Sequence, residues 1–62
     1  MSEEKRKPQY EAEEYGLKVR AWRKRGYILV KVDTPKGERE WEMPLFLGFE
    51  AAAAQAALQS KP

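Results

Sequence analysis

Hydrophobic side chains recur with a period of two in three successive runs of this chain, and an alanine-rich segment follows them. The runs are Leu17–Trp22, Tyr27–Val32 and Glu38–Met43. A period of two places alternate side chains on opposite faces of a strand, so each run predicts a β-strand with one buried face. The second run is rich in β-branched and aromatic residues, which favours it as the central strand.

Short polar segments separate the runs. Residues 23–26, Arg-Lys-Arg-Gly, end in a glycine that can adopt the positive φ of a tight hairpin. Residues 33–37, Asp-Thr-Pro-Lys-Gly, combine a side-chain acceptor, a fixed φ and a second glycine. Pro44 has no N–H and ends the third strand. The pattern predicts an antiparallel meander of three strands.

The segment Ala51–Gln59 predicts a helix that begins near Glu50, whose carboxylate suits the positive end of the helix dipole. So short a helix is marginal alone, so it must pack on the sheet. We expect its contacting stripe to be Phe49, Ala53 or Ala54, and Leu58, and we expect residues 45–49 to close one end of the core. The predicted fold is α+β: a three-stranded antiparallel sheet with one C-terminal helix packed on one face, in a domain spanning residues 16–60.

Residues 1–15 are dominated by charge and predict a flexible N-terminal arm. Within it, residues 10–15 are compatible with either a helical turn or an edge strand. Gly16 ends this segment in both cases.

Composition limits the classes of protein to consider. A single domain of 62 residues hides only about 60% of the surface of its unfolded chain, and a homodimer would enlarge the core. With neither cysteine nor histidine, the chain offers no disulfide, no thiolate metal site and no sign of a cofactor. No run of about 18 apolar residues indicates a membrane span. We therefore expect a soluble cytoplasmic protein.

Alternation assigns the side chains of the three strands to two faces. The face expected to take the helix carries Val19, Ala21, Ile28, Val30, Val32, Trp41 and Met43. The opposite face carries Lys18, Arg20, Trp22, Leu29 and Lys31, together with Glu38, Glu40 and Glu42. This second face is the candidate binding surface.

Two interpretations of the second face remain open. Cations contact phosphate and an exposed indole contacts bases, which favours double-stranded DNA as the partner. The candidate nucleic-acid-binding residues are Lys18, Arg20, Trp22, Arg23, Lys24, Arg25 and Lys31. In the other interpretation, cations pair across strands with the three glutamates to make a solvated face. Trp22 is then exposed, or covered by Tyr10 or Tyr15.

Two resemblances extend these interpretations. Residues 15–20, a Trp followed by a basic turn, Arg39-Glu40-Trp41, and Phe46 followed by Glu50 resemble the plant AP2/ERF DNA-binding domain, and more loosely the N-terminal domain of tyrosine integrases. The resemblance implies major-groove binding by the sheet, with Arg20, Trp22, Arg23 and Lys31 at the DNA and Trp41 near its edge. The three glutamates depart from that pattern because they repel phosphate.

Residues 27–32, residues 41–46 and the alanine segment look like a small podovirus-type inhibitor of bacterial RNA polymerase. This resemblance implies a regulatory protein that binds a host protein. The contacting residues would be Trp22, Leu29, Glu38, Glu40 and Glu42. An enzyme is disfavoured because no nucleophile, histidine or apolar cleft is indicated. We therefore expect a non-enzymatic DNA-binding protein, with host-protein binding as the alternative.

Overall fold

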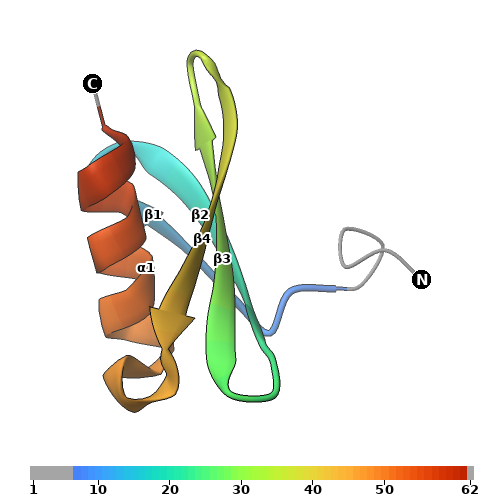
Figure 1. The fold of residues 1–62 in the computed structure, drawn as a ribbon. Coiled ribbons are helices and arrows are strands. Elements are labelled where there is room, and N and C mark those ends of the chain that lie inside the picture. Colours follow the sequence, from blue (N-terminus) through green and yellow to red (C-terminus); the bar gives the residue numbers. More distant parts are fainter. Residues whose placement is uncertain (1–6, 62) are drawn as a thin grey trace.

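The computed structural model describes residues 7–61, which form a four-stranded antiparallel sheet with one helix lying across one face (Figure 1). The sheet order follows the chain, β1-β2-β3-β4. The elements are β1 (Tyr10–Glu14), β2 (Leu17–Arg23), β3 (Tyr27–Thr34), β4 (Gly37–Pro44), the 3-10 turn η2 (Leu45–Leu47) and α1 (Gly48–Ser60). The α+β class holds, but the prediction of three strands was wrong.

The additional strand is β1, taken from the segment that the sequence left open and that we grouped with the N-terminal arm. It pairs antiparallel with β2 from Tyr10 opposite Ala21 to Glu14 opposite Leu17. The connecting turn is Tyr15-Gly16, and both residues have positive φ, 54° and 78°. A two-residue hairpin loop of this kind matches the twist of the strands it joins. Three glutamates in five residues concealed the strand, because an edge strand can carry charge on both faces. The first six residues of the predicted arm lie outside the described part.

The helix side of the sheet holds the core. Aliphatic side chains from β2 and β3 meet four small alanines of α1, which allow the helix axis to approach the sheet closely. The buried residues there are Leu17, Val19, Ala21, Ile28, Val30, Val32, Met43, Ala52, Ala53, Ala56 and Ala57. Trp41 packs against this cluster and is partly buried. The assignment of the sheet faces made from alternation is therefore confirmed on this side.

One detail of the helix prediction was wrong. Leu58 is 44% exposed, so the buried stripe runs through the alanines and ends at Ser60. The helix begins at Gly48, directly after η2 and two residues before Glu50, which agrees with the expected start near Glu50. Gly48 has φ +74°, a conformation that glycine adopts without the strain other residues incur, and it redirects the chain from the turn into the helix.

Residues 45–49 were expected to close one end of the core, and only some of them do. Leu47 and Phe49 pack against the core, and the Phe49 ring stacks on Tyr10 with centroids 5.7 Å apart. Leu45 and Phe46 instead face outward, with exposed fractions of 36% and 87%. Leu47 and Phe49 therefore contribute to the core, whereas Leu45 and Phe46 belong to the surface.

Candidate functional site

The outer face of the sheet, which is the face turned away from α1, presents its side chains in rows set by the strand register. One row joins Glu13, Lys18, Asp33 and Glu38, and the next joins Glu11, Arg20, Lys31 and Glu40. A third row joins Trp22, Leu29 and Glu42. All the outward residues that the sequence named on the strands do lie together, and β1 adds two carboxylates to them.

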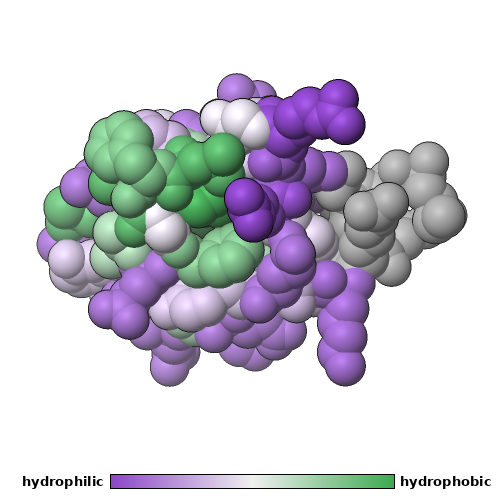
Figure 2. All heavy atoms as spheres, turned by 90° about the horizontal axis from the view of Figure 1, so that it is seen from below, coloured by the Kyte–Doolittle hydropathy of each residue, from purple (hydrophilic) through white to green (hydrophobic). Residues whose placement is uncertain are grey.

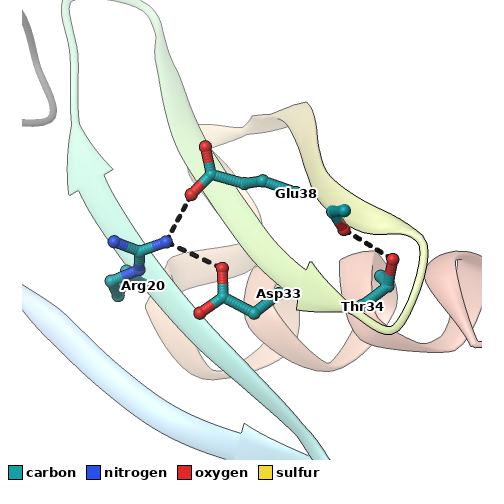
Figure 3. A network of polar contacts seen from close by, with 5 residues as sticks. Arg20, Asp33, Thr34 and Glu38 are labelled. Atoms are coloured by element: carbon teal, nitrogen blue, oxygen red, sulfur yellow. Dashed lines mark hydrogen bonds and ion pairs between the residues drawn. The ribbon is translucent and has the colours of Figure 1, made fainter.

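Arg20 lies at the centre of this face and is held by carboxylates from two strands (Figure 3). Its Nη2 donates to Asp33 Oδ1 at 2.9 Å and also to Glu38 Oε2. Its Nε is buried and has no hydrogen-bond acceptor among residues 7–61. Both bonds thus use one nitrogen, and the forked geometry that makes arginine pairs strong is not formed. Arg20 therefore stabilises the sheet surface modestly and is committed to intramolecular contacts.

Trp22 is buried, with only 3% of its surface exposed, so the prediction of an exposed indole was wrong. Neither tyrosine covers it: Tyr10 stacks on Phe49 on the helix side, and Tyr15 is 56% exposed with Lys61 Nζ 4.8 Å from its ring centroid. On the outer face, Lys31 Nζ lies 5.7 Å from the centroid of the Trp22 ring. Leu29 and Lys31 are buried there too, with 4% and 3% of their surface exposed. This strip has the burial of a small second core.

The charge of the outer face is opposite to what the DNA hypothesis requires. Among residues 7–61, the strands present three cations on this face, Lys18, Arg20 and Lys31, and six carboxylates, Glu11, Glu13, Asp33, Glu38, Glu40 and Glu42, which is an excess of three negative charges. One cation is bridged to two acids and another is buried. Such a surface repels a phosphate backbone. Of the seven predicted nucleic-acid-binding residues, Lys18, Arg20, Trp22 and Lys31 therefore lie in unsuitable surroundings.

The other three predicted residues lie at one end of the sheet: Arg23 is the last residue of β2, opposite Ile28, and Lys24 and Arg25 lie in the turn to β3. The backbone N–H of Lys24 donates to Tyr27 O at 2.8 Å, which closes the turn. Gln9 Oε1 accepts from the backbone N–H of Arg23 at 2.5 Å. Arg23 and Arg25 are exposed. Three consecutive cations therefore lie at the last pair of the β2–β3 ladder and in the turn that follows it.

Exposed apolar side chains lie at this same end. Tyr27 pairs with Pro44, so the basic turn that precedes Tyr27 and the η2 corner that follows Pro44 extend from neighbouring strand ends. Figure 2 views the molecule from this end and shows apolar side chains gathered beside strongly hydrophilic ones. We call this surface the basic-apolar end and define it by Arg23, Lys24, Arg25, Tyr27, Pro44, Leu45 and Phe46.

Phe46 is the residue that sequence reasoning missed. Its apolar neighbours suggested a core position, yet it is the most exposed large hydrophobic side chain of the described residues, at 87%. The signal was present in the sequence: five consecutive apolar or glycine residues at a corner, Leu45 to Phe49, exceed what a single small core can cover. A protruding phenylalanine at the same end of the sheet as three cations is a distinctive surface feature of residues 7–61.

Residues 7–61 contain no group of three or more acidic, cysteine or histidine side chains arranged to hold a metal ion. No helix within the same residues has the length and apolar character needed to cross a bilayer.

Comparison with known proteins returned no match to a protein-family model, to a curated protein or to a solved structure.

Proposed function

We propose that the protein is a non-enzymatic nucleic-acid-binding protein that contacts its ligand through the basic-apolar end. The observation that carries this proposal is the coincidence of the Arg23-Lys24-Arg25 turn with an 87% exposed phenylalanine at one end of the sheet. Cations and an aromatic ring are the two side-chain types that bind phosphates and bases without requiring a deep pocket.

The cations supply most of the expected affinity. Each arginine can donate two parallel hydrogen bonds to one phosphate, and the release of condensed counterions favours the complex. The turn joins β2 and β3, the two inner strands of the sheet, so its side chains would meet a phosphate backbone at the end of the sheet. The footprint differs from the one expected from the sequence, because it excludes the acidic outer face and keeps only the turn.

Phe46 supplies a contact that cations cannot. An exposed aromatic ring can stack on an unpaired base, or insert between base pairs as an apolar wedge. Stacking contributes about 1–3 kcal/mol for each base in proteins that bind single strands. We therefore expect the Phe46 ring to contribute affinity that does not depend on salt concentration.

The experiment that tests the proposal is a titration of fluorescently labelled 20-nucleotide single-stranded and duplex DNA, followed by anisotropy at several salt concentrations. Three phosphate contacts predict a log–log slope of about −3 on duplex DNA and about −2 on a single strand. The double variant Arg23→Gln with Arg25→Gln should reduce both the affinity and the slope. Lys18→Gln, which removes a cation from the outer face, is the matched control and should change neither.

Absence of binding to both forms of DNA at 50 mM salt would rule out the proposal. A loss in the Lys18→Gln control that is half that of the double arginine variant or more would also rule out the assigned surface, because the control removes one charge and the double variant two, and the affinity would then follow net charge alone.

A second candidate function is docking on another protein, and the exposure of Leu45 beside Phe46 favours it. An aliphatic side chain does not stack on bases but fills an apolar pocket, and exposed aromatic residues are frequent anchors of protein interfaces. The expected anchors, Trp22 and Leu29, are buried, so Phe46 takes their place. Glu38, Glu40 and Glu42 are exposed on β4 and would then set specificity by charge.

Bacterial RNA polymerase is the partner that the sequence resemblance names, and a titration with the purified enzyme separates the two functions. Protein docking predicts that Phe46→Ala weakens this interaction by tenfold or more, with little dependence on salt. Nucleic-acid binding predicts no complex with polymerase that has been freed of nucleic acid.

A further inference from the structure

A cleft of about 200 Å³ lies at the opposite end of β3 from the basic turn, between the β3–β4 turn and the C-terminal end of α1. Lys36 enters it from the turn, Arg39 from β4 and Lys61 from the residue after the helix. Hydroxyl groups of Thr34 and Ser60 also line it. None of the lining residues is acidic. Three segments of the chain therefore bring three positive charges to one small concavity.

Aromatic rings, and not carboxylates, accompany two of these cations. Arg39 Cζ lies 5.5 Å from the centroid of the Trp41 ring, and Lys61 Nζ lies 4.8 Å from that of Tyr15. Within residues 7–61, both ion pairs belong to Arg20, so none of the cleft cations is neutralised by an acid there. A ring face attracts a cation but does not occupy its N–H donors as a carboxylate does. These donors stay available to a ligand.

The hydroxyl groups are fixed by the fold. Ser60 is 9% exposed, and its Oγ accepts a hydrogen bond from Trp41 Nε1 at 2.7 Å, which leaves the hydroxyl proton to be donated. Thr34 Oγ1 donates to Gly37 O at 2.5 Å and accepts from the backbone N–H of Lys36 at 3.3 Å, so it orders the turn that carries Lys36 (Figure 3). The cleft thus combines three cations with one oriented donor.

The end of the helix opposes an anion only weakly. Its dipole is equivalent to about half a negative charge, whereas the cleft carries three full positive charges. The backbone N–H of Lys61 also donates to Ala57 O at 2.9 Å, which satisfies one of the terminal carbonyls. The positive charge of the three cations therefore exceeds the partial negative charge of the helix end, and the cleft stays positively charged.

From this geometry we infer that the cleft binds a single phosphate group, either free or as the ester of a larger ligand. Phosphate accepts several charge-assisted hydrogen bonds at once, which matches converging ammonium, guanidinium and hydroxyl donors. The cleft is smaller than the roughly 300–1,000 Å³ pockets that enclose drug-sized ligands, so it fits the phosphate group and leaves the remainder of an ester outside. This site is independent of the basic-apolar end.

The test is a ¹H–¹⁵N NMR titration of the full chain with sodium phosphate, and separately with O-phosphoserine, at constant ionic strength maintained with sodium chloride. Saturable shifts confined to residues 34–39 and 59–61 are expected. Saturation by either ligand supports the inference, and a response to phosphoserine alone identifies the ester as the ligand. Failure of both ligands to give saturable shifts in these residues overturns the inference.

Variants establish which residues bind. Lys36→Gln removes an exposed turn cation that makes no core contact, and it should weaken phosphate binding about tenfold, as loss of one charge-assisted hydrogen bond does. Arg39→Gln should do the same. Arg25→Gln, at the opposite end of the molecule, is the matched control. Shifts that persist in the first two variants, or that vanish equally in the control, contradict a defined site.

Discussion

The two faces of the sheet reach similar burial by different chemistry. The face under α1 buries aliphatic side chains such as Val19, Val30 and Val32 against alanines. No helix of residues 7–61 covers the outer face, yet Trp22, Leu29 and Lys31 are each less than 5% exposed there, among charged side chains that include the ion pairs of Arg20. A sheet face without a covering helix is therefore not necessarily available to a ligand.

The contrast also separates structural roles from functional ones. The central side chains of both faces are buried or, like Arg20, ion-paired, whereas Arg23, Arg25 and Phe46 are exposed at one end. A surface available to a ligand is thus expected at the end of the sheet and not on its flat side. Substitutions on the two faces and at the end test this distinction.

The largest expected effect is that of Trp22→Ala. If the outer face is a real second core, removal of a buried indole costs about 3–5 kcal/mol, which equals the whole stability expected for a domain of this size. Urea denaturation followed by circular dichroism should show a largely unfolded variant. Trp22→Phe should keep the fold, and Val30→Ala, at about 2 kcal/mol, gives the scale of the helix side. A loss below 1 kcal/mol for Trp22→Ala would show that the indole only rests on the surface.

A smaller effect is expected for Arg20→Gln. The side chain of Arg20 is 33% exposed and its two bonds share one nitrogen, so solvent screening limits their contribution to less than about 1 kcal/mol. The free energy of unfolding of the variant should approach that of the wild type in 1 M sodium chloride. A loss above 2 kcal/mol that salt does not reduce would mean that the outer face depends on this ion-pair network.

The smallest effect on stability is expected for Phe46→Ala. A side chain that is 87% exposed contributes little to folding, so the free energy of unfolding should change by less than about 0.5 kcal/mol. Phe49→Ala is the matched control, because its ring stacks on Tyr10 and its loss should cost more than about 1 kcal/mol. Equal stability losses in the two variants would place Phe46 in the core and remove it from the proposed surface.

Alternation predicted the helix side of the sheet well because period two is a local property of the chain. Val30 and Trp41 lie where the pattern places them, since strand register leaves no other face for them. The same pattern predicted correctly that Trp22 faces away from α1. It could not predict burial, because burial on the outer face depends on neighbours such as Leu29 and Lys31 and on packing that no local pattern encodes.

The strand β1 was left open and the exposed Phe46 was missed, for opposite reasons. Residues 10–14 carry so much charge that we grouped them with the N-terminal arm and did not choose between a helical turn and an edge strand, yet an edge strand needs only Tyr10 directed toward the core. Residues 45–49 are so apolar that they predict burial, yet the corner has more apolar side chains than the core accommodates. In both segments, amino-acid composition indicates only a preference for burial or exposure. Whether a side chain is actually buried depends on its neighbours in the tertiary structure.

The most direct test of the account is a map of the DNA-contacting residues, obtained from ¹H–¹⁵N NMR spectra of the protein titrated with a short oligonucleotide at low salt. Amide shifts are expected to concentrate at residues 23–27 and 44–47, at the basic-apolar end. Residues 18–20, 31–33 and 38–42 on the outer face should stay unchanged. Shifts centred on the outer face, with the end unaffected, would contradict it.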